Sequence, residues 1–143
     1  MRFSTANKDL GDPDELELAW VDRRDDARIL AERGRTGLAI ACGIYALEIK
    51  LKTIICRKLD LERSPKEFEI HDLQGLLTVA GLSRKINAHP LIKLQWVRVV
   101  ETARELNDFR YRPNHSFSIE QMTEFFFSLE DPAEGVLPWL STL

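Results

Sequence analysis

Apolar residues recur at helical spacing along most of this chain. The clearest stripe runs from Leu38 to Cys56, where apolar positions return every three to four residues. A second stripe runs from Leu91 to Leu106. No stretch shows the alternation of apolar and polar residues that a half-buried strand requires. The pattern predicts an all-α fold, an up-and-down bundle of about five helices joined by short loops.

Polar and turn-forming residues mark the limits of the first two helices. Residues 1–13 form a polar lead-in, and residues 14–143 form a single helical domain. Asp12-Pro13-Asp14 predicts the start of the first helix, because proline fits its first position and acids favour its first turn. Glycines within residues 33–37 predict a break, and the long second helix ends near Leu59.

The next two helices carry more specific end signals. Asp72 is a good N-cap for a short helix, and Gly81 suits the left-handed position after that helix, with Leu82 as the accompanying apolar contact. A longer helix begins near Pro90 and reaches about residue 109. Pro113 ends it, because proline forces the preceding residue out of the helical region.

The last long helix begins with a capping box. Ser118-Ile119-Glu120-Gln121 has the required spacing, and Phe117 and Met122 stand at the hydrophobic staple positions around it. Three consecutive phenylalanines follow at 125–127. Together with Trp139 they are expected in the core or at a dimer interface rather than as a stacking surface for bases.

Composition limits the function without defining it. The chain has 143 residues, 44% apolar and 30% charged, with a net charge of −3. This is a normal globular balance with no global basic field, so any RNA contact must come from a local patch. The longest apolar runs are too short to span a bilayer. Cys42 and Cys56 lie roughly 21 Å apart on one helix, which predicts reduced thiols in a cytoplasmic protein.

Other polar residues have ordinary structural interpretations. Glu48 and Lys52 form a helical i,i+4 pair, either at the surface or drawn into a site. His71 precedes a helix and is expected to pack or hydrogen-bond against a neighbouring helix. His89 is expected to be a helix-entry residue. Neither the cysteines nor the histidines have the spacing of metal ligands, so no metal and no cofactor is predicted.

Several segments occur together in an order that resembles a known family. They are YALEIKLKTIIC (45–56), HDLQGLL (71–77), AGL (80–82), Trp96 and FRYRP (109–113), followed by an aromatic-rich last helix. Together they resemble the HEPN superfamily (higher eukaryotes and prokaryotes nucleotide-binding) over residues 36–130. The resemblance implies a bundle of four to five helices that is often dimeric.

The resemblance also implies two kinds of function. Many family members are metal-independent ribonucleases of toxin–antitoxin and phage-defence systems, and others are non-catalytic binding or assembly modules. The nuclease members carry an arginine, four to six residues and then a histidine. Arg110 and His115 match this spacing with four residues between them. Tyr111, where a small polar residue is usual, and Pro113 differ from the nuclease pattern.

The chemistry of RNA cleavage assigns roles to residues 107–115, NDFRYRPNH, which we call the corner segment. Cleavage requires a base for the 2′-hydroxyl proton, a cation for the phosphorane and an acid for the leaving oxygen. Histidine suits the proton steps, and the arginine fork suits a phosphate. His115 and Arg110 are therefore the predicted catalytic residues. The predicted substrate-binding residues are Arg112 on a second phosphate, Tyr111 stacked on a base, and Asn114.

Three interpretations of the function remain open at this stage. The leading expectation is an endoribonuclease that acts on RNA as a homodimer, whose facing corner segments supply acid and base, with an antitoxin or another defence protein as a further partner. The second is a non-catalytic module that binds a partner protein or a nucleotide. The third is a helical interaction subunit whose corner segment only connects two helices, with its arginines favouring the helix C-terminus.

Overall fold

The computed structural model describes residues 12–62 and 72–143, apart from the side chains of Asn107, Asp108 and Arg110. Every regular element in these residues is helical, so the predicted all-α class is confirmed. Within the described residues, four long helices and three short ones are joined by turns and two 3₁₀ helices. In chain order they are α2 (Pro13–Glu32), α3 (Thr36–Lys58), α4 (Leu73–Val79), α5 (Ser83–Asn87), α6 (Pro90–Glu105), η2 (Leu106–Tyr111), η3 (Asn114–Ser116), α7 (Ile119–Glu130) and α8 (Val136–Ser141).

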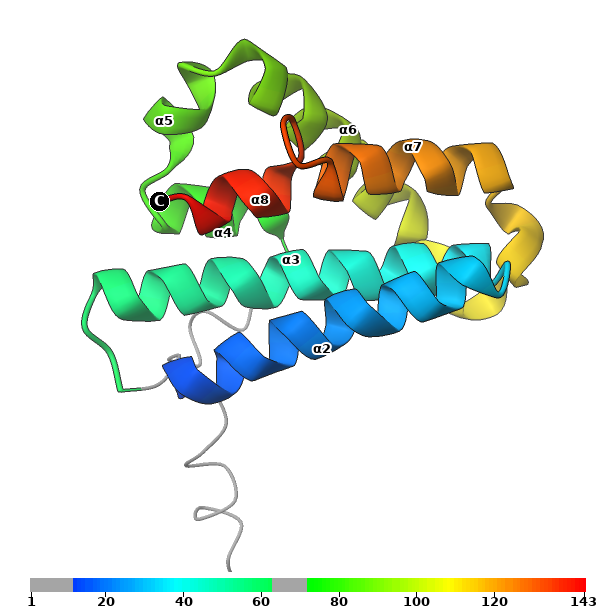
Figure 1. Ribbon diagram of the computed structural model, residues 1–143, viewed down its shortest axis with the longest axis horizontal. Helices are drawn as coiled ribbons and strands as arrows, with labels where there is room; N and C mark the ends of the chain where they lie inside the picture. The colour runs from blue at the N-terminus through cyan, green and yellow to red at the C-terminus, as the bar shows by residue number, and fades with distance from the viewer. Residues whose placement is uncertain (1–11, 63–71) are drawn as a thin grey trace, which may run out of the picture.

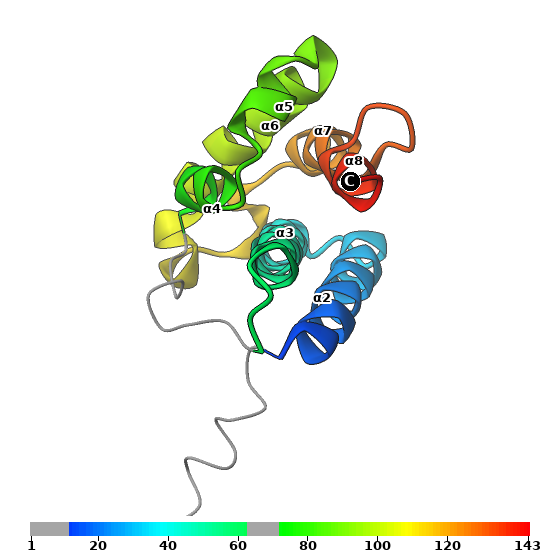
Figure 2. The ribbon, with the colours of Figure 1, turned by 90° about the vertical axis from the view of Figure 1, so that its left-hand side faces the viewer.

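Helix α3 occupies the centre of the bundle. It runs antiparallel beside α2, while α4 and α7 lie against other sides of it (Figures 1 and 2). The 3₁₀ helices η2 and η3 also contact α3. Because α3 is surrounded in this way, most of its 23 residues are buried, including small ones such as Ala39 and Ala46 that allow close approach of its neighbours.

The core is one continuous apolar cluster around α3. Burying a large aliphatic side chain stabilises a fold by roughly 1.5–3 kcal/mol, so the side chains that water does not reach carry much of the stability. They come from α3, α4, α6, α7 and α8 and include Ile40, Leu47, Leu51, Ile55, Leu76, Leu77, Val99, Leu129, Val136 and Leu140.

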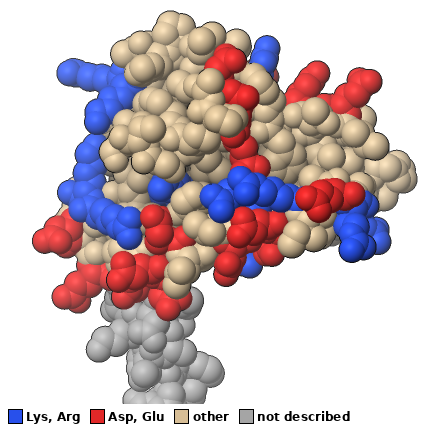
Figure 3. All heavy atoms as spheres, viewed as in Figure 1, with Lys and Arg blue, Asp and Glu red and all other residues tan. Residues whose placement is uncertain are grey.

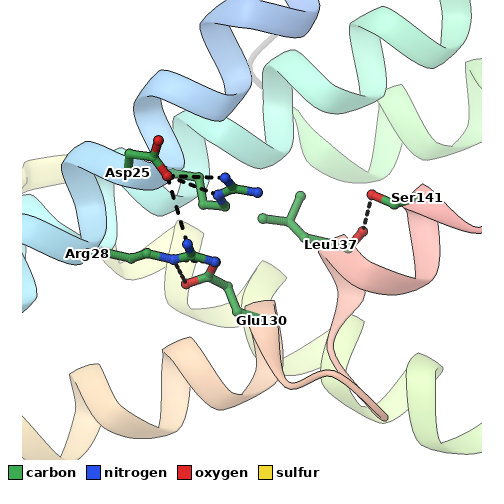
Figure 4. A network of polar contacts seen from close by, with 6 residues as sticks. Asp25, Arg28, Glu130, Leu137 and Ser141 are labelled. Atoms are coloured by element: carbon green, nitrogen blue, oxygen red, sulfur yellow. Dashed lines mark hydrogen bonds and ion pairs between the residues drawn. The ribbon is translucent and has the colours of Figure 1, made fainter.

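Helix α2 contributes less to the core than α3 does. Only Trp20 and Ala27 are buried along it. An ion pair joins α2 to α7, with the Arg28 guanidinium 2.7 Å from Glu130 and 3.9 Å from Asp25 (Figure 4). The Arg28 side chain is 52% exposed, so this pair contributes about 1 kcal/mol at most.

The predicted helix starts are confirmed by hydrogen bonds. Asp12 and Asp72 each accept a bond from the backbone N–H two residues later. Ser118 and Gln121 make both bonds of the capping box, at 2.8 and 3.0 Å. Each bond satisfies a donor that the first turn of a helix would otherwise leave unpaired.

The helix ends follow the Schellman pattern. After α4, Gly81 has φ of 72° and Leu82 N–H donates to Leu77 at 3.2 Å, as predicted. The same pattern closes α2, where Gly34 also has φ of 72°. After α3 the left-handed position is taken by Asp60, with φ of 54°.

Two parts of the bundle differ from the sequence-based expectation. Helix α5 was not predicted, because five residues with only Ile86 buried leave no periodic pattern. The helix expected to reach about residue 109 ends at Glu105, and the chain continues as the tighter η2. Asn107 and Asp108 explain the change, since both residue types favour turns over helix interiors.

Candidate functional site

The corner segment joins α6 to α7 and lies against the beginning of α3. Its residues form η2 and η3, separated by the extended residues Arg112 and Pro113. The predicted break at Pro113 is thus confirmed, with a ψ of 160° at the proline itself. The segment turns the chain at the end of the bundle where α2 passes into α3 (Figure 1).

Asn114 caps α3 from 76 residues away. Its side-chain oxygen accepts a hydrogen bond from the backbone N–H of Leu38 at 3.0 Å. The local N-cap, Arg35, makes no capping bond with its side chain. The buried Thr36 hydroxyl lies 2.7 Å from the backbone oxygens of both Asn114 and Phe117 and donates its hydrogen to this pair. The corner segment is therefore fastened to the first turn of α3 by polar contacts at Thr36 and Leu38.

An aromatic contact fixes the same junction. The rings of Phe109 and Phe117 meet edge to face, with centroids 6.4 Å apart. The Phe109 ring lies directly on Gly37, and a Cβ at position 37 would overlap it. Glycine at this position thus lets the corner segment approach α3 closely enough for the Asn114 cap to form.

The predicted site residues have different surroundings. Tyr111 is 81% exposed, and Arg112 and His115 are also exposed. The backbone of Arg110 lies in η2, but its side chain falls outside the described part of the structure. The pairing of Arg110 with His115 around one phosphate therefore stays a prediction. Asn114 is half-buried, because its side-chain oxygen is engaged by α3.

A recess of about 370 Å³ lies beside the corner segment. Its lining combines two guanidinium groups with one carboxylate, a hydroxyl and an aromatic edge. The residues are Arg104, Glu105, Arg112, Ser116 and Phe117. Two arginines facing one recess can bind the two non-bridging oxygens of a phosphate.

A neighbouring groove between α6 and α7 has the opposite charge. It encloses about 370 Å³, and Gln95 and Ser128 are joined beneath it by a buried 2.7 Å hydrogen bond. Three carboxylates, Glu101, Glu105 and Glu124, face it together with the single cation Arg98. These carboxylates disfavour a phosphate group in this groove, in contrast to the recess that Arg104 and Arg112 line.

A further recess was not identified from the sequence. It encloses about 440 Å³ near the C-terminal end of α3, between α2, α5 and α8. Its cationic residues are Lys50, Arg57, Lys58 and Lys85. The one sequence signal is Lys50, a lysine among the apolar positions of α3, and spacing alone does not distinguish it from a lysine that extends to solvent.

The remaining polar residues have structural positions. The carboxylate of Glu48 and the ammonium of Lys52 are 3.6 Å apart, and both side chains are largely buried. His89 is the N-cap residue of α6 and meets Trp139 edge to face at 6.1 Å. His71 lies outside the described residues. Both cysteines, Cys42 and Cys56, are present as thiols, as predicted.

The phenylalanine cluster divides between core and surface. Phe125 is buried, Phe126 is half-buried against it, and Phe127 is 43% exposed. The core interpretation is confirmed for Phe125. A dimer contact through Phe127 stays a prediction.

Searches for metal sites and membrane spans were confined to residues 12–62 and 72–143. In these ranges no three histidine, cysteine or acidic side chains converge in a way that could hold a metal ion. None of the helices formed there has the length and apolarity needed to cross a bilayer.

Comparison of this chain with protein-family models, with curated proteins and with solved structures finds no match. The resemblance to HEPN domains therefore stays a prediction. The functional argument rests on the residues and geometry of this chain alone.

Proposed function

We propose that this chain is a HEPN-like RNA-binding protein that cleaves RNA at the corner segment without a metal ion. The observation that carries the proposal is the shared exposure of Tyr111, Arg112 and His115 on a segment that Asn114 and Thr36 fasten to α3. An aromatic ring, a guanidinium and an imidazole are the groups that stack a base, bind a phosphate and move a proton. Fixing them to the central helix reduces the cost of positioning them for RNA.

In the proposed reaction the RNA supplies its own nucleophile. The 2′-oxygen forms a bond to the adjacent phosphorus as the bond from phosphorus to the 5′-oxygen breaks, which leaves a 2′,3′-cyclic phosphate and a 5′-hydroxyl. One imidazole takes the proton of the 2′-hydroxyl, and an imidazolium gives a proton to the departing 5′-oxygen. His115 of each of two copies supplies these roles, while Arg110 balances the charge on the phosphorane.

A second candidate function is a non-catalytic binding module. It is favoured by the engagement of Asn114, because this predicted substrate-binding group already caps α3. In this case the exposed corner segment binds RNA or a partner protein and no bond is broken. The two candidates differ in product formation and agree in binding.

The deciding experiment follows cleavage of a labelled single-stranded RNA in the presence of EDTA. We expect cyclic-phosphate products from the wild-type protein. His115→Ala and Arg110→Ala should each lower the rate by about 10²-fold or more. Both variants should unfold at the wild-type temperature, because His115 is exposed and Arg110 lies on a connecting segment.

The matched control is Arg84→Ala, which removes an exposed cation on α5, at the other end of the bundle from the corner segment (Figure 1). Its cleavage rate should equal that of the wild type. Absence of products from the wild-type protein, or equal cleavage rates for all four proteins, would contradict the proposal that the protein is a nuclease. Binding of RNA without cleavage products would favour the second candidate function, a non-catalytic binding module.

A further inference from the structure

The recess at the C-terminal end of α3 has the charge of an anion site. Lysine and arginine side chains gather along this edge of the molecule, over α5 and the end of α3 (Figure 3). Four cations, Lys50, Arg57, Lys58 and Lys85, line the recess with one carboxylate, Glu17. The excess of cations is local, because the whole chain carries a net charge of −3.

Lys50 is the most informative of these residues. Its side chain is only 9% exposed, and its ammonium lies 4.6 Å from the centre of the Trp20 ring. Among the described residues its one ion-pair partner is Glu17, at a long 3.9 Å. Burial lowers the pKa of Lys50, and nearby Arg57 adds to this effect while Glu17 opposes it. A buried ammonium with so distant a counter-charge is costly unless another anion approaches it.

Glu17 cannot neutralise Lys50 fully because other groups share it. The indole N–H of Trp20 donates to one carboxylate oxygen of Glu17, and Arg57 lies 3.4 Å from the other. Arg57 also lies 3.7 Å from Asp14. These contacts pair Arg57 well and leave Lys50 with little of the available negative charge.

The remaining two cations have unused capacity as donors. The Lys58 ammonium donates one hydrogen bond to the backbone oxygen of Ala80 at 2.9 Å, and an ammonium has three donors. Lys85, in the middle of α5, has no ion pair or hydrogen bond from its side chain in the part of the chain that the structure describes. Both side chains can therefore turn toward a bound anion without breaking an ion pair.

The recess also has an apolar part to its lining. Ile54, Leu82, Leu140 and Leu143 line it together with the charged groups, and Thr53 adds a hydroxyl. Its volume of about 440 Å³ is in the range that holds a small organic ligand. A recess lined by both cations and aliphatic groups is complementary to an anion that carries an apolar body.

We propose that this recess binds a small organic phosphate, whose phosphate lies among Lys50, Lys58 and Lys85 and whose apolar part lies against Ile54, Leu82 and Leu140. The phosphate supplies the negative charge that Lys50 lacks. This site is separate from the corner segment, which lies at the N-terminal end of α3, and it does not depend on the proposed cleavage of RNA.

Calorimetric titration of the full chain at about 0.15 M salt tests the proposal. The probes are phenyl phosphate, inorganic phosphate and benzyl alcohol. We expect saturable binding of phenyl phosphate with a Kd below about 1 mM, weaker binding of inorganic phosphate and none of the alcohol. Lys50→Met and Lys85→Glu should each raise the Kd for phenyl phosphate about tenfold or more, as expected for loss of a charged contact.

Control variants distinguish specific binding in the recess from non-specific electrostatic attraction to surface cations. Arg33→Ala removes a cation far along α2 and should leave the Kd unchanged. Lys50→Met should remain folded, because Glu17 keeps Trp20 and Arg57 as partners. The proposal is overturned if binding of phenyl phosphate does not saturate, or if Lys50→Met and Lys85→Glu bind it with the wild-type Kd. It is also overturned if Arg33→Ala raises the Kd as much as these two substitutions do.

Discussion

At the scale of single residues, Asn114 shows how one side chain can take part in both the fold and the candidate site. Its oxygen satisfies the Leu38 N–H, which the first turn of α3 would otherwise leave unpaired. Its backbone oxygen accepts from Thr36. The residues on either side of it, Pro113 and His115, are exposed. Asn114 thus holds the exposed part of the corner segment at the N-terminus of α3.

This role leads to a stability prediction. Asn114→Ala should lower the free energy of unfolding by about 1 kcal/mol, the usual value of an N-cap. Asn114→Asp should lower the free energy of unfolding by only a few tenths of a kcal/mol, because a carboxylate accepts the same hydrogen bond and is favoured at a helix N-terminus. Urea denaturation of the three proteins measures both values. Equal stability of Asn114→Ala and the wild type would show that the cap contributes nothing.

At the scale of helices and their connections, the contact between Gly37 and Phe109 joins the start of α3 to the corner segment. A helical glycine normally costs about 1 kcal/mol relative to alanine. Here that cost is offset by the close approach of the aromatic ring. The contact between the Phe109 ring and Gly37 therefore compensates for the low helix propensity of glycine in the first turn of α3.

Gly37→Ala should consequently destabilise the protein despite its higher helix propensity. We expect a net loss of about 1–2 kcal/mol, because overpacking costs about 1–3 kcal/mol and propensity returns part of it. In a Phe109→Leu background the same substitution should cost less, because the smaller side chain leaves room for a Cβ. A double-mutant cycle in urea measures the coupling. Additive effects would show that the ring and the glycine do not interact.

At the scale of the whole molecule, the charge distribution limits how the proposed RNA substrate could be attracted. The net charge of −3 gives no long-range attraction for a polyanion. Arg104 and Arg112 face one recess, and the carboxylates of the adjacent groove border it. Binding of RNA should therefore depend on a few contacts rather than on the field of the whole protein.

The salt dependence of RNA affinity measures this directly. A single-stranded RNA loses about 0.7 units of log affinity per decade of salt for each phosphate contacted. We expect a total slope of about −2 and a reduction in its magnitude of about 0.7 for Arg112→Ala. Arg84→Ala, which removes an exposed cation on α5, should keep the wild-type slope. An unchanged slope for Arg112→Ala would place the RNA contact elsewhere on the molecule.

The ends of the helices show how far local sequence can be read. The caps at Asp72 and Ser118 and the left-handed Gly81 were predictable, because each interaction joins residues only two to five positions apart. The short α5 was not predictable, because it is too brief to show a period. The tight η2 was missed because helical periodicity continues into it through Leu106 and Phe109.

The sequence by itself determined the all-α class, the long helices and the ends capped by nearby residues. Each of these depends on chemistry within a few residues or on a repeat along one helix. Only the tertiary structure decided that Asn114 caps a helix 76 residues earlier and that Arg28 pairs with a carboxylate 102 residues later. It also decided that Lys50 and Lys85 share one recess. Such contacts form when packing of the apolar core brings distant segments together. The local sequence around each polar group does not predict which partner it then meets.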